Sequence, residues 1–183
     1  MAREMIRQGG RSARIQEEVH KAVNALLKTH DRSEITVPMV AERAGVTPST
    51  VYRRWGDLAQ LFADVAVAHM RPQGEPENTG DTQRDIESFI LQYAEEMSSR
   101  VGRQMLADVI GGGGSQATVK CCGFTYVYLE TINSRAIARG EAGFSVEDVV
   151  DFVVAPVIYH ILFKDSAPTP DYCLQLVARL FHG

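Results

Sequence analysis

The chain has 183 residues, 45% of them apolar, and a net charge of −4, so it can bury a sizeable core and is not an intrinsically disordered protein. It has no apolar run of the roughly 18 residues that a membrane span requires. No apolar segment follows the basic N-terminal stretch, as one would in a secretory signal. We therefore expect a cytoplasmic protein with no membrane partner.

The three cysteines do not have the pattern of a disulfide framework, because their number is odd and Cys121 and Cys122 are adjacent. No cysteines or histidines have the spacing of a metal site. We expect neither a bound metal nor a cofactor. The adjacent cysteines could sense oxidants, but burial as small apolar side chains is the simpler interpretation.

The charge is unevenly distributed along the chain. Residues 1–71 carry 11 basic and 8 acidic side chains, whereas residues 72–183 carry 8 and 15. Four arginines within the first 14 residues face a single acid, Glu4. A basic N-terminal part suits a surface that faces nucleic acid, although a solvated, disordered tail explains the same arginines equally well.

The apolar residues recur at helical spacing along the whole chain. Thr36 and Thr47 each stand one or two residues before a proline, and a capping hydroxyl followed by a first-turn proline marks a helix start. Gly45 and Gly56 mark helix ends. The predicted helices of this part cover about residues 12–29, 37–44, 48–55 and 57–70.

Residues 71–81 are rich in proline, glycine and acids and predict a linker. Beyond it, four glycines at 111–114 interrupt the helical pattern, and Pro156 should kink the helix that contains it. The helices predicted after the linker cover about residues 86–97, 103–110, 116–139, 145–163 and 170–182.

These elements predict an all-α fold of about nine helices. We expect a first helical domain over residues 1–56, a connecting helix and linker over 57–80, and a second helical domain over 81–183.

Residues 37–55 have the pattern of a helix-turn-helix. This motif needs a small residue where its two helices touch, a glycine in the turn and a branched apolar residue on the second helix, and Ala41, Gly45 and Val51 have that spacing. Val51 and Trp55 should then point inward, while short hydroxyls and arginines face outward, where they can bind phosphates and base edges. An ordinary helical hairpin would need the same glycine turn.

Residues 35–61 resemble the DNA-binding domain of the tetracycline-repressor family. The matching residues are Val40-Ala41, Ala44-Gly45-Val46, Thr47 and Thr50-Val51-Tyr52-Arg53-Arg54-Trp55. The resemblance implies that Thr47, Tyr52 and Arg54 contact phosphates and that Ser49, Thr50 and Arg53 lie near the major groove. The candidate DNA-binding residues are Thr36, Thr47, Pro48, Ser49, Thr50, Tyr52, Arg53 and Arg54.

One position departs from the family pattern. The family usually begins its fourth helix with Ser-Lys-Glu, and the lysine contacts the DNA backbone. Here Asp57-Leu58-Ala59 stands in its place, so that contact is missing and Asp57 adds repulsion.

A stripe of aromatic and sulfur-containing side chains in the second half is the candidate ligand pocket, because such side chains adapt to apolar guests. Plain core packing explains the same residues equally well. The candidates are Tyr93, Met97, Met105, Cys122, Tyr126 and Phe152.

The function predicted from these features is a sequence-specific repressor that binds a palindromic double-stranded DNA operator as a homodimer. A small, largely apolar effector would release it. A ligand-independent activator and a constitutive DNA-binding protein are alternatives. An enzyme is a more distant alternative, because no nucleophile stands with a matching base in the sequence.

Overall fold

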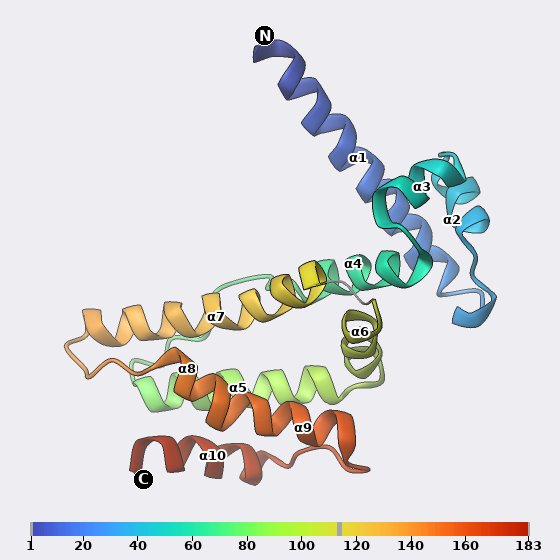
Figure 1. Ribbon diagram of the computed structural model, residues 1–183. Helices are drawn as coiled ribbons and strands as arrows, with labels where there is room; N and C mark the ends of the chain where they lie inside the picture. The colour runs from blue at the N-terminus through green and yellow to red at the C-terminus, as the bar shows by residue number, and fades with distance from the viewer. Residues whose placement is uncertain (1, 113–114, 183) are drawn as a thin grey trace. The chain divides into compact units, whose positions relative to one another are not determined.

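The computed structural model describes residues 2–112 and 115–182, except for the side chains of 2–9, 115 and 182. Within these ranges every regular element is a helix (Figure 1). Counting residues 146–163 as one continuous helix, the described ranges contain nine helices of eight residues or more, besides one short 3-10 turn. The predicted all-α fold is confirmed.

The described chain forms two compact units. The first contains residues up to His69 together with 108–112, and the second contains residues 70–107 and 115–182. The boundary falls inside one helix, α6 (Arg100–Gly111), which begins in the second unit and ends in the first. The borders expected at residues 56 and 80 would separate independently folding domains, so they stay a prediction.

The first unit is built from α1 (Ala2–Leu26), η1 (Arg32–Glu34), α2 (Val37–Ala44), α3 (Pro48–Trp55) and α4 (Leu58–Met70), with the end of α6. Its core is mostly aliphatic but includes Trp55 and Phe62, and its largest fully buried side chains are Val19, Val23, Val40, Val51 and Leu61.

Helix α1 begins at Ala2, ten residues before the predicted start. The prediction depended on the apolar stripe, which does not extend into this basic segment. Only Gly9 and Gly10 in the segment disfavour a helix, and propagation of an existing helix is favourable.

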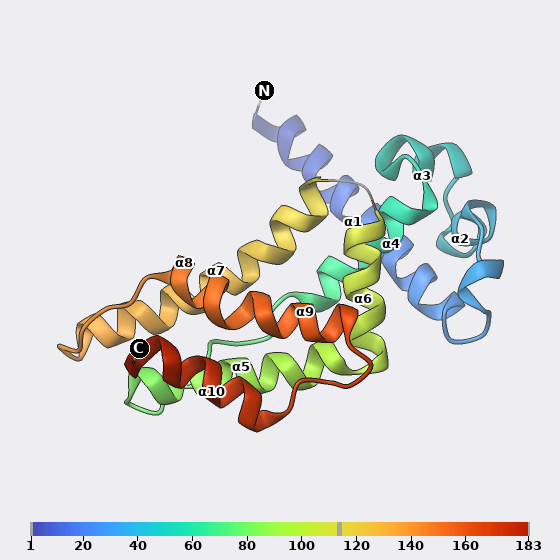
Figure 2. The ribbon, with the colours of Figure 1, turned by 60° about the horizontal axis from the view of Figure 1, so that its bottom comes forward.

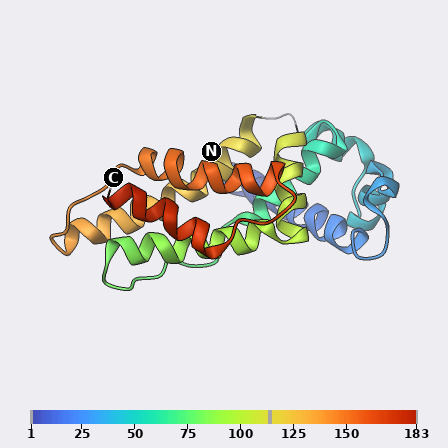
Figure 3. The ribbon, with the colours of Figure 1, turned by 90° about the horizontal axis from the view of Figure 1, so that it is seen from below.

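The second unit contains α5 (Thr82–Ser98), most of α6, α7 (Ser115–Ala138), α8 (Val146–Val149), η2 (Val150–Val154), α9 (Ala155–Phe163) and α10 (Pro170–His182). Helix α5 is central and contacts α7, α9 and α10 (Figures 2 and 3). The largest fully buried side chains of this core are Ile86, Ile90, Leu129, Ile132 and Ile161.

The helix over residues 146–163 reaches Phe163, as predicted, and its irregularity lies just before Pro156. Residues Val150–Val154 form a π-helical turn, in which the Ala155 N–H donates to Val150 O, five residues earlier. A proline cannot donate to the helical ladder, and a wider turn before it is one way to accommodate this.

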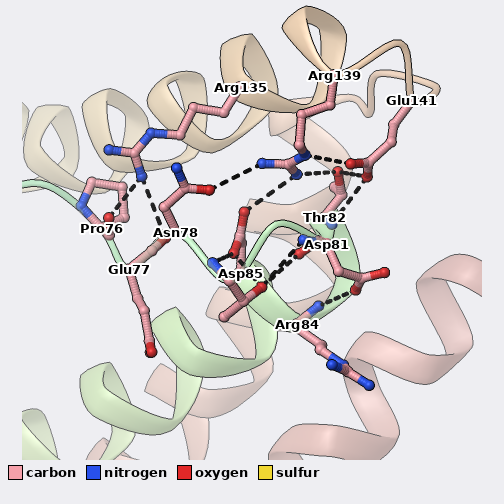
Figure 4. A network of polar contacts seen from close by, with 11 residues as sticks. Pro76, Glu77, Asn78, Asp81, Thr82, Arg84, Asp85, Arg135, Arg139 and Glu141 are labelled. Atoms are coloured by element: carbon pink, nitrogen blue, oxygen red, sulfur yellow. Dashed lines mark hydrogen bonds and ion pairs between the residues drawn. The ribbon is translucent and has the colours of Figure 1, made fainter.

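The segment between α4 and α5 is a loop, as predicted, but side chains of α7 hold it in place (Figure 4). Arg135 Nη1 donates to the carbonyls of Pro76, at 2.7 Å, and Glu77, at 3.3 Å. The Tyr128 hydroxyl donates to Gly74 O at 2.9 Å. The loop is therefore part of the second unit.

Next to this loop, Arg139 and Glu141 close a polar cluster around the buried side chains of Thr82 and Asp85 (Figure 4). Arg139 pairs with Glu141 and donates to Thr82 Oγ1, while its Nη2 lies 3.4 Å from the fully buried Asp85 carboxylate. Asp85 Oδ1 also accepts from the Thr79 N–H at 2.7 Å. The cluster joins the start of α5 to the end of α7.

Candidate DNA-binding surface and ligand pocket

The turn between α2 and α3 has the geometry that the spacing of Ala41, Gly45 and Val51 predicts. Gly45 has a φ of +66°, the left-handed conformation that ends α2 and that a side chain would strain. Ala41 and Val51 are buried, at 0% and 1% exposure, where the two helices meet. Thr36 caps α2 by accepting a hydrogen bond from the Met39 N–H at 3.5 Å.

Helix α3 exposes the residues that the sequence marks as DNA-binding candidates. Val51 and Trp55 are buried, while Thr50 is half-buried. The structure therefore brings the candidates of α3 to one outer face. The remaining candidates are all exposed: Thr36, Thr47, Pro48, Ser49, Tyr52, Arg53 and Arg54.

Thr47 occupies the N-cap position of α3, but its side chain makes no capping hydrogen bond to the backbone. That part of the sequence prediction is wrong. Its hydroxyl oxygen lies 2.9 Å from the hydroxyls of both Ser49 and Thr50. These three groups form a small hydroxyl cluster at the start of the helix, and hydroxyls in this position can donate to phosphate oxygens.

Arg54 is held by α1. Its Nη1 donates to Ser12 Oγ at 2.7 Å and its Nη2 donates to Gln16 Oε1 at 3.2 Å. A guanidinium has five N–H donors, so these two bonds fix the direction of the side chain and leave donors for an anion. No local pattern predicts Ser12 or Gln16 as its partners, because they lie about 40 residues earlier in the chain.

Asp64 of α4 ties three helices of the first unit together. Its Oδ2 accepts hydrogen bonds from Trp55 Nε1 at 2.9 Å and from Gln16 Nε2 at 2.8 Å. His20 Nε2 lies 2.9 Å from the same oxygen. The end of α3 is thereby fixed against α1 and α4.

Asp57, which replaces part of the family's Ser-Lys-Glu pattern, has a structural role. Its Oδ1 accepts a hydrogen bond from the Gln60 N–H at 2.8 Å. The carboxylate therefore caps α4, and its negative charge also interacts favourably with the positive N-terminal end of the helix dipole. The family pattern reveals the lost lysine but not this cap.

A pocket in the second unit lies between α5 and α7, with about 580 Å³ of space that includes open solvent at its mouth. One wall is a single face of α5, formed by Phe89, Gln92, Tyr93, Glu96 and Met97. The opposite wall belongs to α7, to the last residue of α4 and to the segment after it, and consists of Cys121, Phe124, Thr125, Tyr128, Met70 and Pro72.

Of the six ligand-binding candidates, Tyr93 and Met97 line this pocket and the other four do not. Met105 and Tyr126 are partly buried against the core of the unit. Cys122 is exposed beside the pocket-lining Cys121. Phe152 is 61% exposed on the helix over residues 146–163.

Two ionisable groups in the pocket walls are held in their neutral forms. Burial raises the pKa of the Tyr93 phenol well above its usual value, and the neighbouring thiols of Cys121 and Cys122 add to this shift. Burial likewise raises the pKa of the Cys121 thiol to about 11. A neutral thiol is a weak nucleophile, so Cys121 acts in this wall as a small polarisable side chain.

Helix α6 packs closely at both of its ends. At Gly102 an added Cβ would lie 2.7 Å from the Cα of the pocket residue Met97. The start of α6 can therefore pack directly on the end of α5 because Gly102 has no side chain. At the other end, Arg32 Nη1 donates to Asp108 Oδ2 at 2.8 Å. The Arg32 guanidinium also lies 3.9 Å from the centre of the Phe62 ring of α4.

Gly112 has a packing role as well. It is buried, and a Cβ there would lie 2.5 Å from the Cβ of Ala63. The missing side chain of Gly112 therefore permits close contact with α4 just after the end of α6. Gly113 and Gly114 lie outside the described residues.

Within the part of the chain that the structure describes, none of the helices is both long and apolar enough to cross a membrane. The same part holds no group of three or more His, Cys, Asp or Glu side chains that could bind a metal ion.

Helix α3 has the position of the recognition helix, the second helix of a helix-turn-helix, and its exposed face is typical of DNA-binding regulators. Residues 76–180 match the family model described as tetracyclin repressor-like, C-terminal domain. Residues 21–65 match the model of bacterial regulatory proteins of the tetR family. The chain belongs to the tetracycline-repressor (TetR) family of transcriptional regulators.

Several relatives cover most of the chain. The HTH-type transcriptional regulator YdeS of Bacillus subtilis is 24% identical over 179 residues, which are 91% of this chain and 90% of YdeS. Mb1581 of Mycobacterium bovis is 25% identical over 162 residues, 83% of this chain and 78% of its own. AqdR of Rhodococcus erythropolis is 24% identical over 155 residues, which are 82% of this chain and 75% of AqdR.

The fold is also that of a solved relative. The crystal structure of the TetR family transcription regulator SCO0332 matches with a TM-score of 0.69 at 22% identity. The match covers 92% of this chain and 97% of that one.

Proposed function

We propose that the protein is a repressor that binds a palindromic operator as a homodimer and leaves it when a small ligand fills the pocket between α5 and α7. The observation that carries this proposal is the course of α6. This helix packs on pocket residues at Gly102 and ends among side chains of the DNA-binding unit at Asp108 and Gly112.

DNA binding is proposed to occur through the exposed face of α3. Arg53 has the side chain best suited to read a guanine, because a guanidinium can donate to O6 and N7 together. The hydroxyls of Thr47 and Ser49 and the Tyr52 phenol suit phosphate oxygens, whose contacts set register and orientation. Arg54, directed by Ser12 and Gln16, suits a phosphate beside the groove.

Dimerisation is proposed to use the outer face of the helix over residues 146–163. Phe152, Tyr159 and Phe163 are 61%, 57% and 72% exposed there, while the inner face of the same helix is buried in the core. A helix that is apolar on two faces has a second surface to bury. Two copies related by a two-fold axis would present two α3 helices to a palindrome.

Ligand control is proposed to pass through α5 and α6. A guest that separates α5 from α7 displaces Glu96 and Met97, whose backbone packs on Gly102. Because α6 is a continuous helix, a shift at Gly102 reaches Asp108, which is bonded to Arg32. Neighbouring major grooves recur about every 34–36 Å on one side of DNA, so a small displacement of each DNA-binding unit spoils the fit.

Transcription in vitro tests the repressor role. Duplexes bound by the protein are first selected from random-sequence DNA, and the selected site is then placed within a promoter. We expect less transcript when the protein is added and recovery of transcript when a binding small molecule is added. More transcript with the protein would indicate an activator, and repression insensitive to every bound ligand would indicate a constitutive DNA-binding protein.

A matched pair of glycine variants tests the path through α6. Gly112→Ala places a methyl group against Ala63 and should displace the end of α6, whereas Gly111→Ala meets no atom within 4 Å. We expect Gly112→Ala to change operator affinity or its response to ligand and Gly111→Ala to change neither. If the two variants had the same operator affinity and the same response to ligand, α6 would not transmit the effect of the ligand to the DNA-binding unit.

A further inference from the structure

The pocket walls contain one formally charged side chain among the described lining residues, and it is an acid. Glu96 contributes a carboxylate, and no lysine, arginine or histidine lies in the lining. Glu96 is exposed, so it stands at the open side of the pocket. Gln92, one helical turn earlier on α5, donates to Glu96 Oε1 at 2.8 Å and orients the carboxylate.

Aromatic rings cover much of the remaining wall. The Phe89 ring lies 5.8 Å from Tyr93 and 6.0 Å from Tyr128, measured between ring centres, and Phe124 adds a fourth ring. The hydroxyl of Tyr128 is bonded to Gly74 O, which fixes that ring. Aromatic faces carry partial negative charge and attract cations.

The two titratable groups buried in the pocket walls add no charge of their own. The Cys121 thiol and the Tyr93 phenol are kept neutral by burial. Cys121 Sγ lies 3.8 Å from Met70 Sδ, so two sulfur atoms meet at this wall. Sulfur and aromatic surfaces suit a large, weakly hydrated group, not a compact, strongly hydrated one.

The charge of the second unit has the same sign as Glu96. Residues 70–107 and 115–183 contain 9 basic and 14 acidic side chains. Arg71 and Lys120 are next to lining residues in the sequence, but both are exposed and neither lines the pocket. An anionic guest would meet Glu96 without a compensating charge, whereas a cationic guest is favoured both by the wall and by the surrounding field.

We propose that the ligand of this pocket is an organic cation, an ammonium group with aromatic or alkyl substituents, whose charge faces Glu96 while its apolar part packs among the four rings. This inference builds on the proposed ligand-controlled function, because it names the chemical class of the effector. Acyl carboxylates and phosphate esters should bind more weakly, because they would bring a second negative charge close to Glu96.

Calorimetric titration of the full-length protein without DNA tests the class of ligand. The probes are benzyltrimethylammonium, its uncharged counterpart neopentylbenzene, and the anion phenylacetate. We expect benzyltrimethylammonium to bind and phenylacetate to bind at least tenfold more weakly. In Glu96→Gln the affinity for the cation should fall by about twofold to fivefold, the effect of losing an exposed ion pair, while that for neopentylbenzene stays unchanged.

Glu95→Gln is the matched control, because Glu95 is an exposed neighbour on α5 that does not line the pocket. It should leave all three affinities unchanged. The proposal is overturned if benzyltrimethylammonium does not bind, if phenylacetate binds as tightly, or if Glu96→Gln and Glu95→Gln reduce cation binding equally. Binding that depends on Glu96 but leaves operator affinity unchanged supports the cation site and contradicts the ligand-controlled release of DNA.

Discussion

Trp55 Nε1 and Asp64 Oδ2 lie 2.9 Å apart, so the last residue of the recognition helix is hydrogen-bonded to α4. The same oxygen accepts from Gln16, whose other amide atom accepts from Arg54. A line of hydrogen bonds therefore joins α1, α3 and α4 behind the face proposed to bind DNA. The angle of α3 is set by these bonds together with the apolar core.

Asp64→Ala should destabilise the protein and weaken operator binding. The variant leaves the Trp55 and Gln16 donors without their acceptor, which costs about 1–3 kcal/mol for a buried group. Denaturant unfolding followed by the fluorescence of Trp55, the single tryptophan of the chain, measures the loss. His69→Ala removes an exposed hydrogen bond to Asn24 and should change stability by less than about 0.5 kcal/mol. Equal stabilities of the two variants would contradict this role of Asp64.

Arg53→Ala should weaken specific operator binding by about 1–3 kcal/mol and relax the preference at one base position. Arg54→Ala should instead lower affinity for all duplexes. It should also reduce the slope of log affinity against log salt concentration by about 1, the effect of one lost phosphate contact. Binding to the selected operator and to a scrambled duplex, measured over a range of salt, separates the two effects. Arg179→Ala, an exposed arginine of α10, is the control. Wild-type binding by the Arg53→Ala, Arg54→Ala double variant would rule out this DNA-binding face.

Replacing both Tyr159 and Phe163 by arginine should prevent dimerisation, because two charges would have to be buried in the proposed interface. Sedimentation at micromolar concentration should give a dimer for the wild type and a monomer for the variant, and the monomer should lose operator affinity. Val101→Arg, at a 66% exposed position on α6, should remain a dimer. A monomeric wild type that still binds the operator would refute the dimer.

Glu141 should make stability depend on pH in the acid range. Its hydrogen bond from Arg139, and next that from Thr82, lower its pKa in the folded protein to about 2 from an ordinary value of 4.5. A lowered folded pKa stabilises the fold above the unfolded pKa, and this contribution is lost as the pH falls from 4.5 towards 2. Glu141→Gln should therefore be less stable than the wild type at pH 7, and the difference should shrink below pH 4.5.

Unfolding measured from pH 7 to pH 3 checks this dependence. Glu147→Gln, at an exposed position in the first turn of α8, controls for the loss of a charge. A difference between wild type and Glu141→Gln that stays constant over the whole range would show that the carboxylate charge is not the cause.

The helix-turn-helix could be predicted from the sequence because its signals are local. Gly45 in a left-handed turn and the inward-facing Ala41 and Val51 are set by spacings of four and six residues. The pocket wall on α5 was predictable for the same reason, since Tyr93 and Met97 lie on a stripe bordered by polar residues.

The wall on α7 was not predictable, because α7 carries apolar side chains on several faces. Val127 is exposed on this helix while Leu129 is fully buried. Without a polar side to mark its orientation, the sequence pointed to Cys122 and Tyr126, and the pocket is lined by Cys121 and Tyr128. Partners far apart in the chain, such as Arg32 and Asp108, leave no local signal at all.

The claim that filling the pocket lowers operator affinity is tested most directly by a pair of adjacent substitutions. Cys121→Trp places an indole in the pocket, whereas Cys122→Trp places it at an exposed position on the same helix. Operator affinity is measured by fluorescence anisotropy of a labelled duplex, after circular dichroism has shown that both variants are folded. We predict a 5–150-fold loss for Cys121→Trp, the range of typical allosteric coupling, and wild-type affinity for Cys122→Trp. Wild-type affinity for a folded Cys121→Trp would contradict the claim.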